Sequence, residues 1–420
     1  MKKIFNNLYI LTSIKKIILA IFNFINLILI SRILGPSLKG EYSTVINYVS
    51  MLIVVFNFGL TIIYPHIKKN KDEYIPTLIS MIYFFFSLLF FISMSLVFST
   101  NNVFIKYIYV LVPFTLLANQ VGGLAIIEDI RISTKIYIIT VFIQTFCTIM
   151  LVFLPNETII GPVVVYIIKD LSIILLSSKL LIKHINLEKI SFYKFYKIMS
   201  MGFIPMLAAL MSTLNYKLDI LMLERLGINF YLIGLYTTGT ALAQIVWMFP
   251  DAFKEVIAYK ITREDNNKEV NIALRISVTI AILSILVMYI FGEYGISILF
   301  GTEYIDALDV TIIIFLGNIS MVYFKIIGMY YQVKGKFKYH FWVLLTSVIT
   351  NLILNYLLIP RFNIYGAAIS SIASYSIAGL FYLSNYIKNC NVKKIDVIFI
   401  RKKDIKYMYN QIMKTITGDS

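Results

Sequence analysis

The residues of this chain that could do chemistry are charged side chains placed within long apolar runs. Lysines at such positions suit the binding of an anion, and carboxylates suit the exchange of protons or cations. A charge at the middle of a membrane helix costs roughly 2.5–3.5 kcal/mol, so it persists where it meets water, a partner or a ligand. The charges in question are Lys169, Asp170, Lys217, Asp219, Asp251, Lys254 and Lys325.

Three carboxylates, those of Asp170, Asp219 and Asp251, are candidates for ion or proton coupling. A carboxylate in a low-dielectric environment takes up protons more readily than one in water, so it can bind and release them in a cycle. For Asp170 and Asp219, pairing with cations on other helices is the alternative role.

The run from 229 to 253 carries polar side chains that recur every three or four residues, the spacing of one helix face. We interpret this face as a wall of a polar cavity, with Gln244 as a candidate substrate contact. Hydrogen bonding between helices is the alternative. The run from 42 to 64 carries a shorter polar series of the same kind. The members of the first series are Thr237, Thr240, Gln244, Trp247, Asp251 and, just past the end of the run, Lys254 or Glu255.

The elements that must position these side chains are membrane-spanning helices. Of the 420 residues, 59% are hydrophobic and 14% are charged, against about 25% charged in a soluble domain. Apolar runs of about 20 residues, the length that crosses a bilayer as a helix, recur from end to end. The expected fold is all-α, a polytopic membrane protein with twelve spans: 17–34, 42–64, 75–98, 103–126, 136–154, 159–182, 200–223, 229–253, 271–292, 309–331, 339–359 and 364–387.

Basic residues predict the orientation. We place the N-terminus inside and assign the connections alternately to the two sides of the membrane. The cytoplasmic connections and the two chain ends then contain 28 of the 38 lysines and arginines, and the outer connections contain five. This bias is typical of cytoplasmic loops and places both termini in the cytoplasm. It also accounts for the net charge of +16 without nucleic acid.

The connections predict two halves. The longest of them, 183–199, has the composition of an amphipathic surface linker. The expected domains are an N-terminal six-helix lobe over 1–184, a cytoplasmic linker over 185–199, a C-terminal six-helix lobe over 200–387 and a basic cytoplasmic tail over 388–420.

A weak internal repeat relates the halves. Leu34-Gly35 is followed by Gly40-Glu41-Tyr42, and Leu226-Gly227 is followed by Gly234-Leu235-Tyr236. A proline also precedes a glycine by six residues near the end of each half, at 155–161 and 360–366. Parallel repeats of this kind are a transporter architecture, in which the substrate path lies between the repeats.

Four stretches carry a resemblance to a known family. They are SRILGPSLKGEYS from Ser31, LERLGINFYLIGLYTTGTAL from Leu223, ILFGTEYIDAL from Ile298 and IPRFNIYGAAISSIAS from Ile359. In order and placement they resemble the polysaccharide-biosynthesis or O-antigen (Wzx-type) flippases, within the MATE-like MOP exporter superfamily. The resemblance implies two six-helix lobes around a central polar cavity that opens alternately to each side of a bacterial inner membrane.

The resemblance also implies the substrate, an oligosaccharide repeat unit linked to a polyprenyl diphosphate (the undecaprenyl carrier). It implies membrane lipids, H⁺ or Na⁺, and a polysaccharide polymerase with chain-length proteins as partners. Cations at several depths would offset the lost hydration of the diphosphate; snorkelling to the interface is the alternative for Arg32, Lys254 and Lys325. The candidate substrate contacts are Arg32, Lys169, Lys217, Gln244, Lys254 and Lys325.

Other functions predict features that the sequence lacks. A membrane enzyme would need a large polar loop or clustered histidines and carboxylates for its chemistry, and a scaffold would not need charges in its spans. A MATE-type exporter of cations would need an acidic cavity, and a peptidoglycan lipid-precursor flippase is a further alternative. The two cysteines and three histidines are isolated, so no metal site or cofactor is expected.

Overall fold

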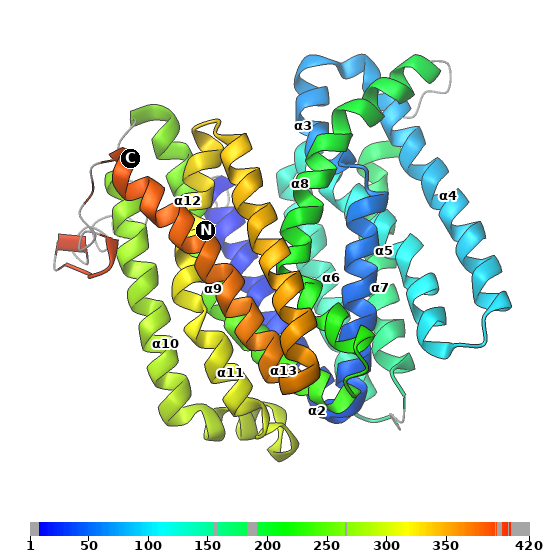
Figure 1. Ribbon diagram of the computed structural model, residues 1–420. Helices are drawn as coiled ribbons and strands as arrows, with labels where there is room; N and C mark the ends of the chain where they lie inside the picture. Colours follow the sequence, from blue (N-terminus) through cyan, green and yellow to red (C-terminus); the bar gives the residue numbers. More distant parts are fainter. Residues whose placement is uncertain are drawn as a thin grey trace. The chain divides into compact units, whose positions relative to one another are not determined.

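The computed structural model describes residues 8–154, 158–182, 191–264, 267–390, 392, 397–401 and 403–404. Over these residues the regular structure is helical (Figure 1), which confirms the all-α prediction. The longer helices are α2 Leu8–Phe56, α3 Leu60–Asn70, α4 Ile75–Ser99, α5 Val103–Glu128, α6 Ile130–Leu151, α7 Ile160–Leu181, α8 Phe192–Arg225, α9 Phe230–Glu264, α10 Lys268–Phe300, α11 Ala307–Leu316, α12 Asn318–Val333 and α13 Phe337–Cys390.

The chain divides into two compact units. Unit 1 is Met1–Glu224 with Asn229–Gly234, and unit 2 is Arg225–Ile228 with Leu235–Ser420. Helix α8, which we expected at the start of the second half, therefore groups with unit 1. It begins at Phe192, inside the expected linker, whose residues 185–190 lie outside the described part.

The spans agree with the expected polytopic membrane protein. In the described part of the chain nine helices are long and apolar enough to cross a membrane, or ten when the bent pair α11–α12 counts as one span. Two of these spans contain a kink, at Gly35 in α2 and at Asn363 in α13. Figure 1 shows α2 and α13 each turning back on itself. When each kinked helix counts as two segments, the described spans correspond to the twelve expected ones.

The first kink differs in detail from the expected turn between residues 34 and 42. Only Gly35 leaves the helical conformation, at φ 64° and ψ 173°, and Pro36 opens the next segment. A positive φ suits glycine, and proline suits a helix start because its missing N–H would have had no partner there. The second segment therefore begins at Pro36, before the expected start at residue 42, so Lys39 lies in its first turns.

Two further breaks interrupt expected spans. The second span ends at Phe56, and α3 starts after Phe58 and Gly59, both of which have positive φ values. The tenth is bent by 42° between α11 and α12, at Gly317. Elsewhere the ends follow local chemistry: the Asp129 carboxylate caps α6 by accepting the N–H groups of Arg131 and Ile132 at 2.9 and 3.0 Å.

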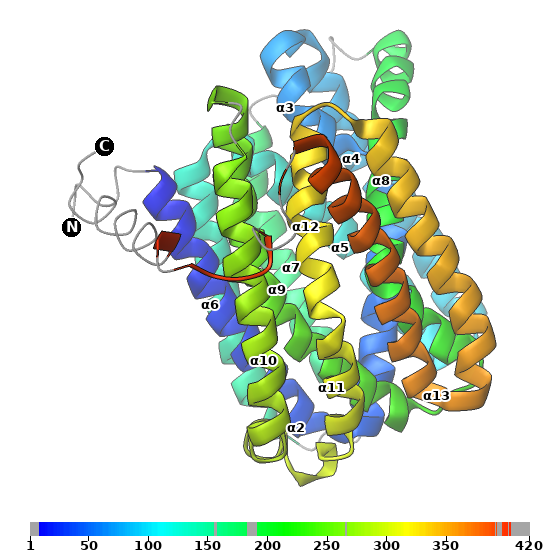
Figure 2. The ribbon, with the colours of Figure 1, turned by 60° about the vertical axis from the view of Figure 1, so that its left-hand side comes forward.

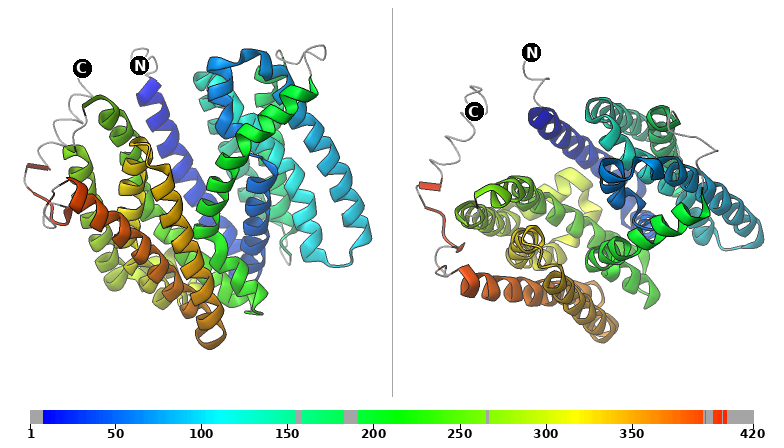
Figure 3. Two further views of the ribbon diagram at one scale, coloured as in Figure 1. Left: turned by 45° about the horizontal axis from the view of Figure 1, so that its top comes forward. Right: turned by 90° about the horizontal axis from the view of Figure 1, so that it is seen from above.

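Within unit 1, α5 packs against α2, α4 and α7, and α6 packs against α2 and α7. One apolar core joins α3, α4 and α5 through Leu60, Leu78 and Val121, and Figure 3 shows the first turns of α8 beside α3. A second core joins α2, α5 and α7 through residues that include Val45, Leu111 and Val163.

Within unit 2, α12 packs against α10 and α13, and α11 packs against the same two helices (Figure 2). Large apolar side chains such as Leu283, Val287 and Ile290 on α10 remain exposed. Exposed apolar side chains on helices of this length are what lipid contact requires.

The two repeat-related turns meet inside unit 1. A Cβ added at Gly40 would lie 1.8 Å from the carbonyl oxygen of Phe230, and one added at Gly234 would lie 1.9 Å from that of Pro36. The glycines therefore allow the start of the second α2 segment and the first turn of α9 to touch backbone to backbone. Close to this contact, the Tyr48 hydroxyl donates to Glu224 at 2.6 Å.

Candidate functional site

Unit 1 contains a pocket of about 210 Å³ beside a buried carboxylate. Side chains from α2, α3, α5, α7 and α8 line it, and Ser50 and Asn57 come from the polar series that we expected on the second span. The other polar lining residues are Thr115, Asn119 and Tyr166. The polar face of the second span therefore lines a cavity over at least part of its length.

Asp170 lies directly behind this pocket, with 2% of its surface exposed. The Thr115 hydroxyl, which lines the pocket, donates to its carboxylate at 2.6 Å, and the Lys169 ammonium lies 3.2 Å from the second carboxylate oxygen. A proton or small cation in the pocket would thus be one hydroxyl group away from Asp170.

Lys169 is bound on two sides. Besides its ion pair with Asp170, its ammonium lies 3.5 Å from the ring centroid of Tyr166, which also lines the pocket. An ammonium over an aromatic face is stabilised by the ring quadrupole. Lys169 therefore keeps its charge close to the pocket although only a fifth of its side chain is exposed.

Lys39 is a buried cation that our sequence reading counted only among the outer charges. It is 6% exposed, and its ammonium lies 5.7 Å from the centroid of the Tyr42 ring. Among the described residues it has no ion pair with a carboxylate. The signal that would have revealed it is its spacing, since Lys39 and Ser50 of α2 and Asn57, the residue directly after α2, recur at helical intervals.

Unit 2 contains a second polar cluster in which one carboxylate meets two lysines. Asp251 on α9 lies 2.7 Å from Lys325 on α12 and 2.7 Å from Lys254, one turn along α9. Lys325 is almost fully buried, whereas 42% of the Asp251 side chain is exposed. The cluster carries a net positive charge and has one accessible side.

Trp247 and Asn318 extend this cluster. The Trp247 indole N–H donates to the Asn318 side-chain oxygen at 2.7 Å, and the Lys325 ammonium lies 5.5 Å from the Trp247 ring. The predicted polar face of α9 thus contributes Trp247, Asp251 and Lys254 to one site. Gln244, from the same series, is exposed.

The remaining candidates stay outside these clusters. Arg32 is exposed on the first segment of α2, Lys217 is half-buried on α8, and Asp219 is 4% exposed on α8. The structure places all three in unit 1, and their roles stay predictions. Sequence reasoning also missed Glu128 on α5, which accepts hydrogen bonds from Tyr64 and Lys68 of α3.

The part of the chain that the structure describes contains no cluster of three or more histidine, cysteine or acidic side chains that could hold a metal ion.

Comparison with known proteins bears on the fold and on the function. No protein-family profile matches the chain. A capsular polysaccharide biosynthesis protein, CapF of Staphylococcus aureus, is 26% identical over 183 residues, which are 42% of this chain and 46% of CapF. The match thus spans about half of that relative.

Solved transporter structures match nearly the whole chain. The lipid II flippase MurJ has a TM-score of 0.72 at 15% identity, and the match covers 97% of this chain and 92% of MurJ. A MATE-family multidrug resistance transporter of the MOP superfamily has a TM-score of 0.69 at 10% identity, and the match covers 89% of this chain and 95% of that one. These likenesses confirm the expected MATE-like fold.

A third structure, a MOP-superfamily transporter from Pyrococcus furiosus, has a TM-score of 0.61 at 12% identity, with 93% of this chain and 96% of that one covered. It is described as having a binding pocket of reverse polarity that suggests a different function. The polarity of the binding site therefore varies among proteins with this fold.

Proposed function

We propose that this multi-pass membrane protein is a flippase for a lipid-linked oligosaccharide. Its substrate would be a repeat unit on a polyprenyl diphosphate, moved across the plasma membrane for surface polysaccharide synthesis. The observation that carries the proposal is the excess of lysines in two groups of residues: Lys39, Lys169 and Asp170 in unit 1, and Asp251, Lys254 and Lys325 in unit 2. Lys39 lacks a carboxylate partner among the described residues, and Asp251 faces two lysines.

This charge balance suits an anionic substrate. A buried charge without a partner costs several kcal/mol, so a fold retains it where a ligand supplies the missing charge. In unit 2, Asp251 is an internal counter-ion for Lys254 and Lys325. A diphosphate can take its place through charge-assisted hydrogen bonds from the same two ammonium groups. The lipid chain stays in the bilayer while the polar path opens alternately to each side of the membrane.

Asp170 is the proposed coupling residue. It is buried, and the Thr115 hydroxyl connects it to the pocket of unit 1. Uptake of H⁺ or Na⁺ there would release Lys169 from its ion pair and so change the charge beside the pocket. Asp219 and Asp251 are further candidates for this role.

Two related functions compete with this proposal. A peptidoglycan lipid-precursor flippase is supported by the likeness to MurJ and would present the same diphosphate, so only a substrate assay separates it. A MATE-type exporter of cationic compounds is supported by the fold, but the lysine excess opposes it, because like charges in one cavity repel.

We place both termini in the cytoplasm because the basic residues crowd the connections on that side. Phosphatase and fluorescent-protein fusions at the C-terminus and at the α10–α11 connection test this. Phosphatase activity at the C-terminus would contradict it.

The test of the function is clean deletion with complementation in the bacterium of origin. We expect loss of surface glycan, accumulation of the lipid-linked oligosaccharide, and rescue by the wild-type gene. Normal surface glycan after deletion, with no second flippase gene present, would refute the assignment. Loss of dye efflux with normal glycan would favour the exporter.

A further inference from the structure

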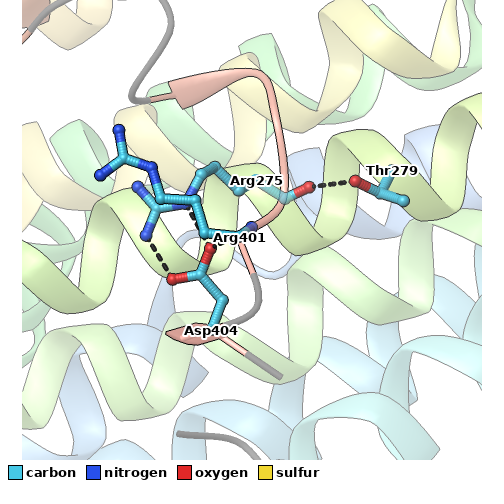
Figure 4. A network of polar contacts seen from close by, with 4 residues as sticks. All are labelled: Arg275, Thr279, Arg401 and Asp404. Carbon is cyan, nitrogen blue, oxygen red and sulfur yellow. Dashed lines mark hydrogen bonds and ion pairs between the residues drawn. The ribbon is translucent and has the colours of Figure 1, made fainter. Parts of the chain in front are cut away.

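The C-terminal segment is docked onto unit 2 by a buried ion pair. The Arg275 guanidinium of α10 donates to both oxygens of Asp404 at 2.7 and 2.5 Å, and both side chains are less than 10% exposed. The backbone N–H of Arg401 donates to the same carboxylate at 2.9 Å. Figure 4 shows this pair, with the Arg401 guanidinium directed away from the carboxylate.

The same face of α10 holds the end of α13. The Tyr386 hydroxyl donates to Asn271 at 2.8 Å, and Asn271 lies one turn before Arg275 on α10. The last turns of α13 and the segment 397–404 are therefore fastened to neighbouring positions of one helix. Val397 is fully buried as a result.

Between α13 and this segment lies an apolar groove of about 560 Å³. This volume falls within the range of roughly 300–1,000 Å³ of small-molecule sites. Its walls are formed mainly by Leu380, Leu383, Ser384 and Ile387 of α13, and by Val397 and Ile398. The groove thus exists because the ion pair holds the second wall in place.

Exposed cations follow both walls. Lys388 comes directly after the groove on α13, and Arg401 and Lys403 come within five residues of Ile398; all three are exposed. Asp404 is neutralised by Arg275. The apolar walls of the groove are thus followed in the chain by exposed positive charges, a combination that is complementary to a lipid with an anionic headgroup.

We propose that this groove binds one acyl chain of an anionic phospholipid of the bilayer, with its phosphate held by Lys388, Arg401 and Lys403. None of its lining residues belongs to the polar clusters of the proposed transport path, and the proposal does not depend on which substrate is moved. Binding there ties the C-terminal segment to the membrane surface.

The experiment uses the purified full-length protein in neutral detergent, titrated with fluorescent phosphatidylglycerol and with phosphatidylcholine of the same chain length. We expect tighter binding of phosphatidylglycerol. The double change R401Q and K403Q should weaken it by about fivefold per charge, because each cation near an anionic lipid surface contributes that factor. The matched control is K336Q with K338Q, two exposed lysines at the start of α13, one directly before its first residue and one in its first turn.

A second variant tests the groove without touching the cations. Ser384→Trp fills it from its exposed side, and should weaken binding of long-chain phosphatidylglycerol while the protein remains monodisperse. Phosphatidylglycerol with six-carbon chains should bind wild type more than tenfold more weakly than the long-chain lipid. Equal binding of both headgroups would assign the groove to ordinary surrounding lipid and overturn the proposal. Equal losses of phosphatidylglycerol binding in the two double variants, or unchanged phosphatidylglycerol binding in Ser384→Trp, would also overturn the proposal.

Discussion

Replacement of Gly40 or Gly234 by alanine should separate two backbones that now touch. The methyl group introduced by Gly40→Ala would lie 1.8 Å from the Phe230 carbonyl oxygen and 2.8 Å from the Gly234 nitrogen. An ordinary carbon–oxygen contact is about 3.3 Å or longer, so the first turn of α9 must move away from α2 by about 1.5 Å. The obstructing atoms are backbone, so no side chain can turn aside to relieve the clash.

The expected cost of either change is about 1–3 kcal/mol, the usual penalty for overpacking, with the upper end favoured by the backbone clash. The two changes are not independent, because one outward movement of the α9 turn relieves both clashes. The double variant should therefore be only slightly less stable than the worse single one.

The assay is thermal unfolding of the purified protein in detergent, followed by size-exclusion chromatography. Gly295 on α10 provides the matched control, because a Cβ there would meet no atom within 4 Å. Gly295→Ala should be neutral or stabilise the helix by up to about 1 kcal/mol. If Gly40→Ala and Gly234→Ala unfolded at the temperature of Gly295→Ala, the close contact would not exist. Fully additive losses in the double variant would refute the shared movement.

Three further changes test the charged sites. Asp170→Asn should lower glycan export at least tenfold and abolish its pH dependence; unchanged export with an unchanged pH response would contradict coupling there. Lys325→Gln should lower export about 10–100-fold, since one charge-assisted hydrogen bond is worth roughly 1.5–3 kcal/mol, whereas Lys338→Gln on the surface should not. Arg275→Leu should release the C-terminal segment, because it leaves Asp404 buried and unpaired at a cost of about 3–5 kcal/mol. The double change Arg275→Leu with Asp404→Leu should restore docking, and the protease sensitivity of the segment measures both effects. Burial alone would raise the pKa of Asp404, but hydrogen bonds from Arg275 and a backbone N–H hold that pKa below its ordinary value. The contribution of the Asp404 ion pair to docking should thus be constant from pH 7 to about 5 and be lost below about pH 4. A fluorophore attached to the C-terminal segment would report this loss.

The positions of the spans could be predicted from sequence because lipid leaves few choices. A run of about 20 apolar residues must form a helix to satisfy its own backbone groups, wherever the run lies in the chain. The breaks at Phe58 and Gly317 were missed, since each interrupts an apolar run without changing its composition. The break at Phe58 and Gly59 is instead set by the close approach of Gly202 on α8.

The candidate charges could also be named from sequence, but their partners could not. Thr115 and Asp170 are 55 residues apart, and Asp251 and Lys325 are 74 apart. Helical spacing says which residues share a face, and it says nothing about which helix that face meets. Lys39 was misread for a related reason, because its burial depends on a helix that starts at Pro36 and packs its next turns against the core.

By itself, the sequence determined that this protein is a helical membrane protein with many spans and that charges lie within these spans. These properties follow from local hydropathy and helix geometry. Only the tertiary structure decided that one aspartate meets two lysines, that the repeat-related glycines touch, and that Arg275 fastens the C-terminal segment 129 residues away. Such contacts depend on packing between distant segments, which no local pattern contains.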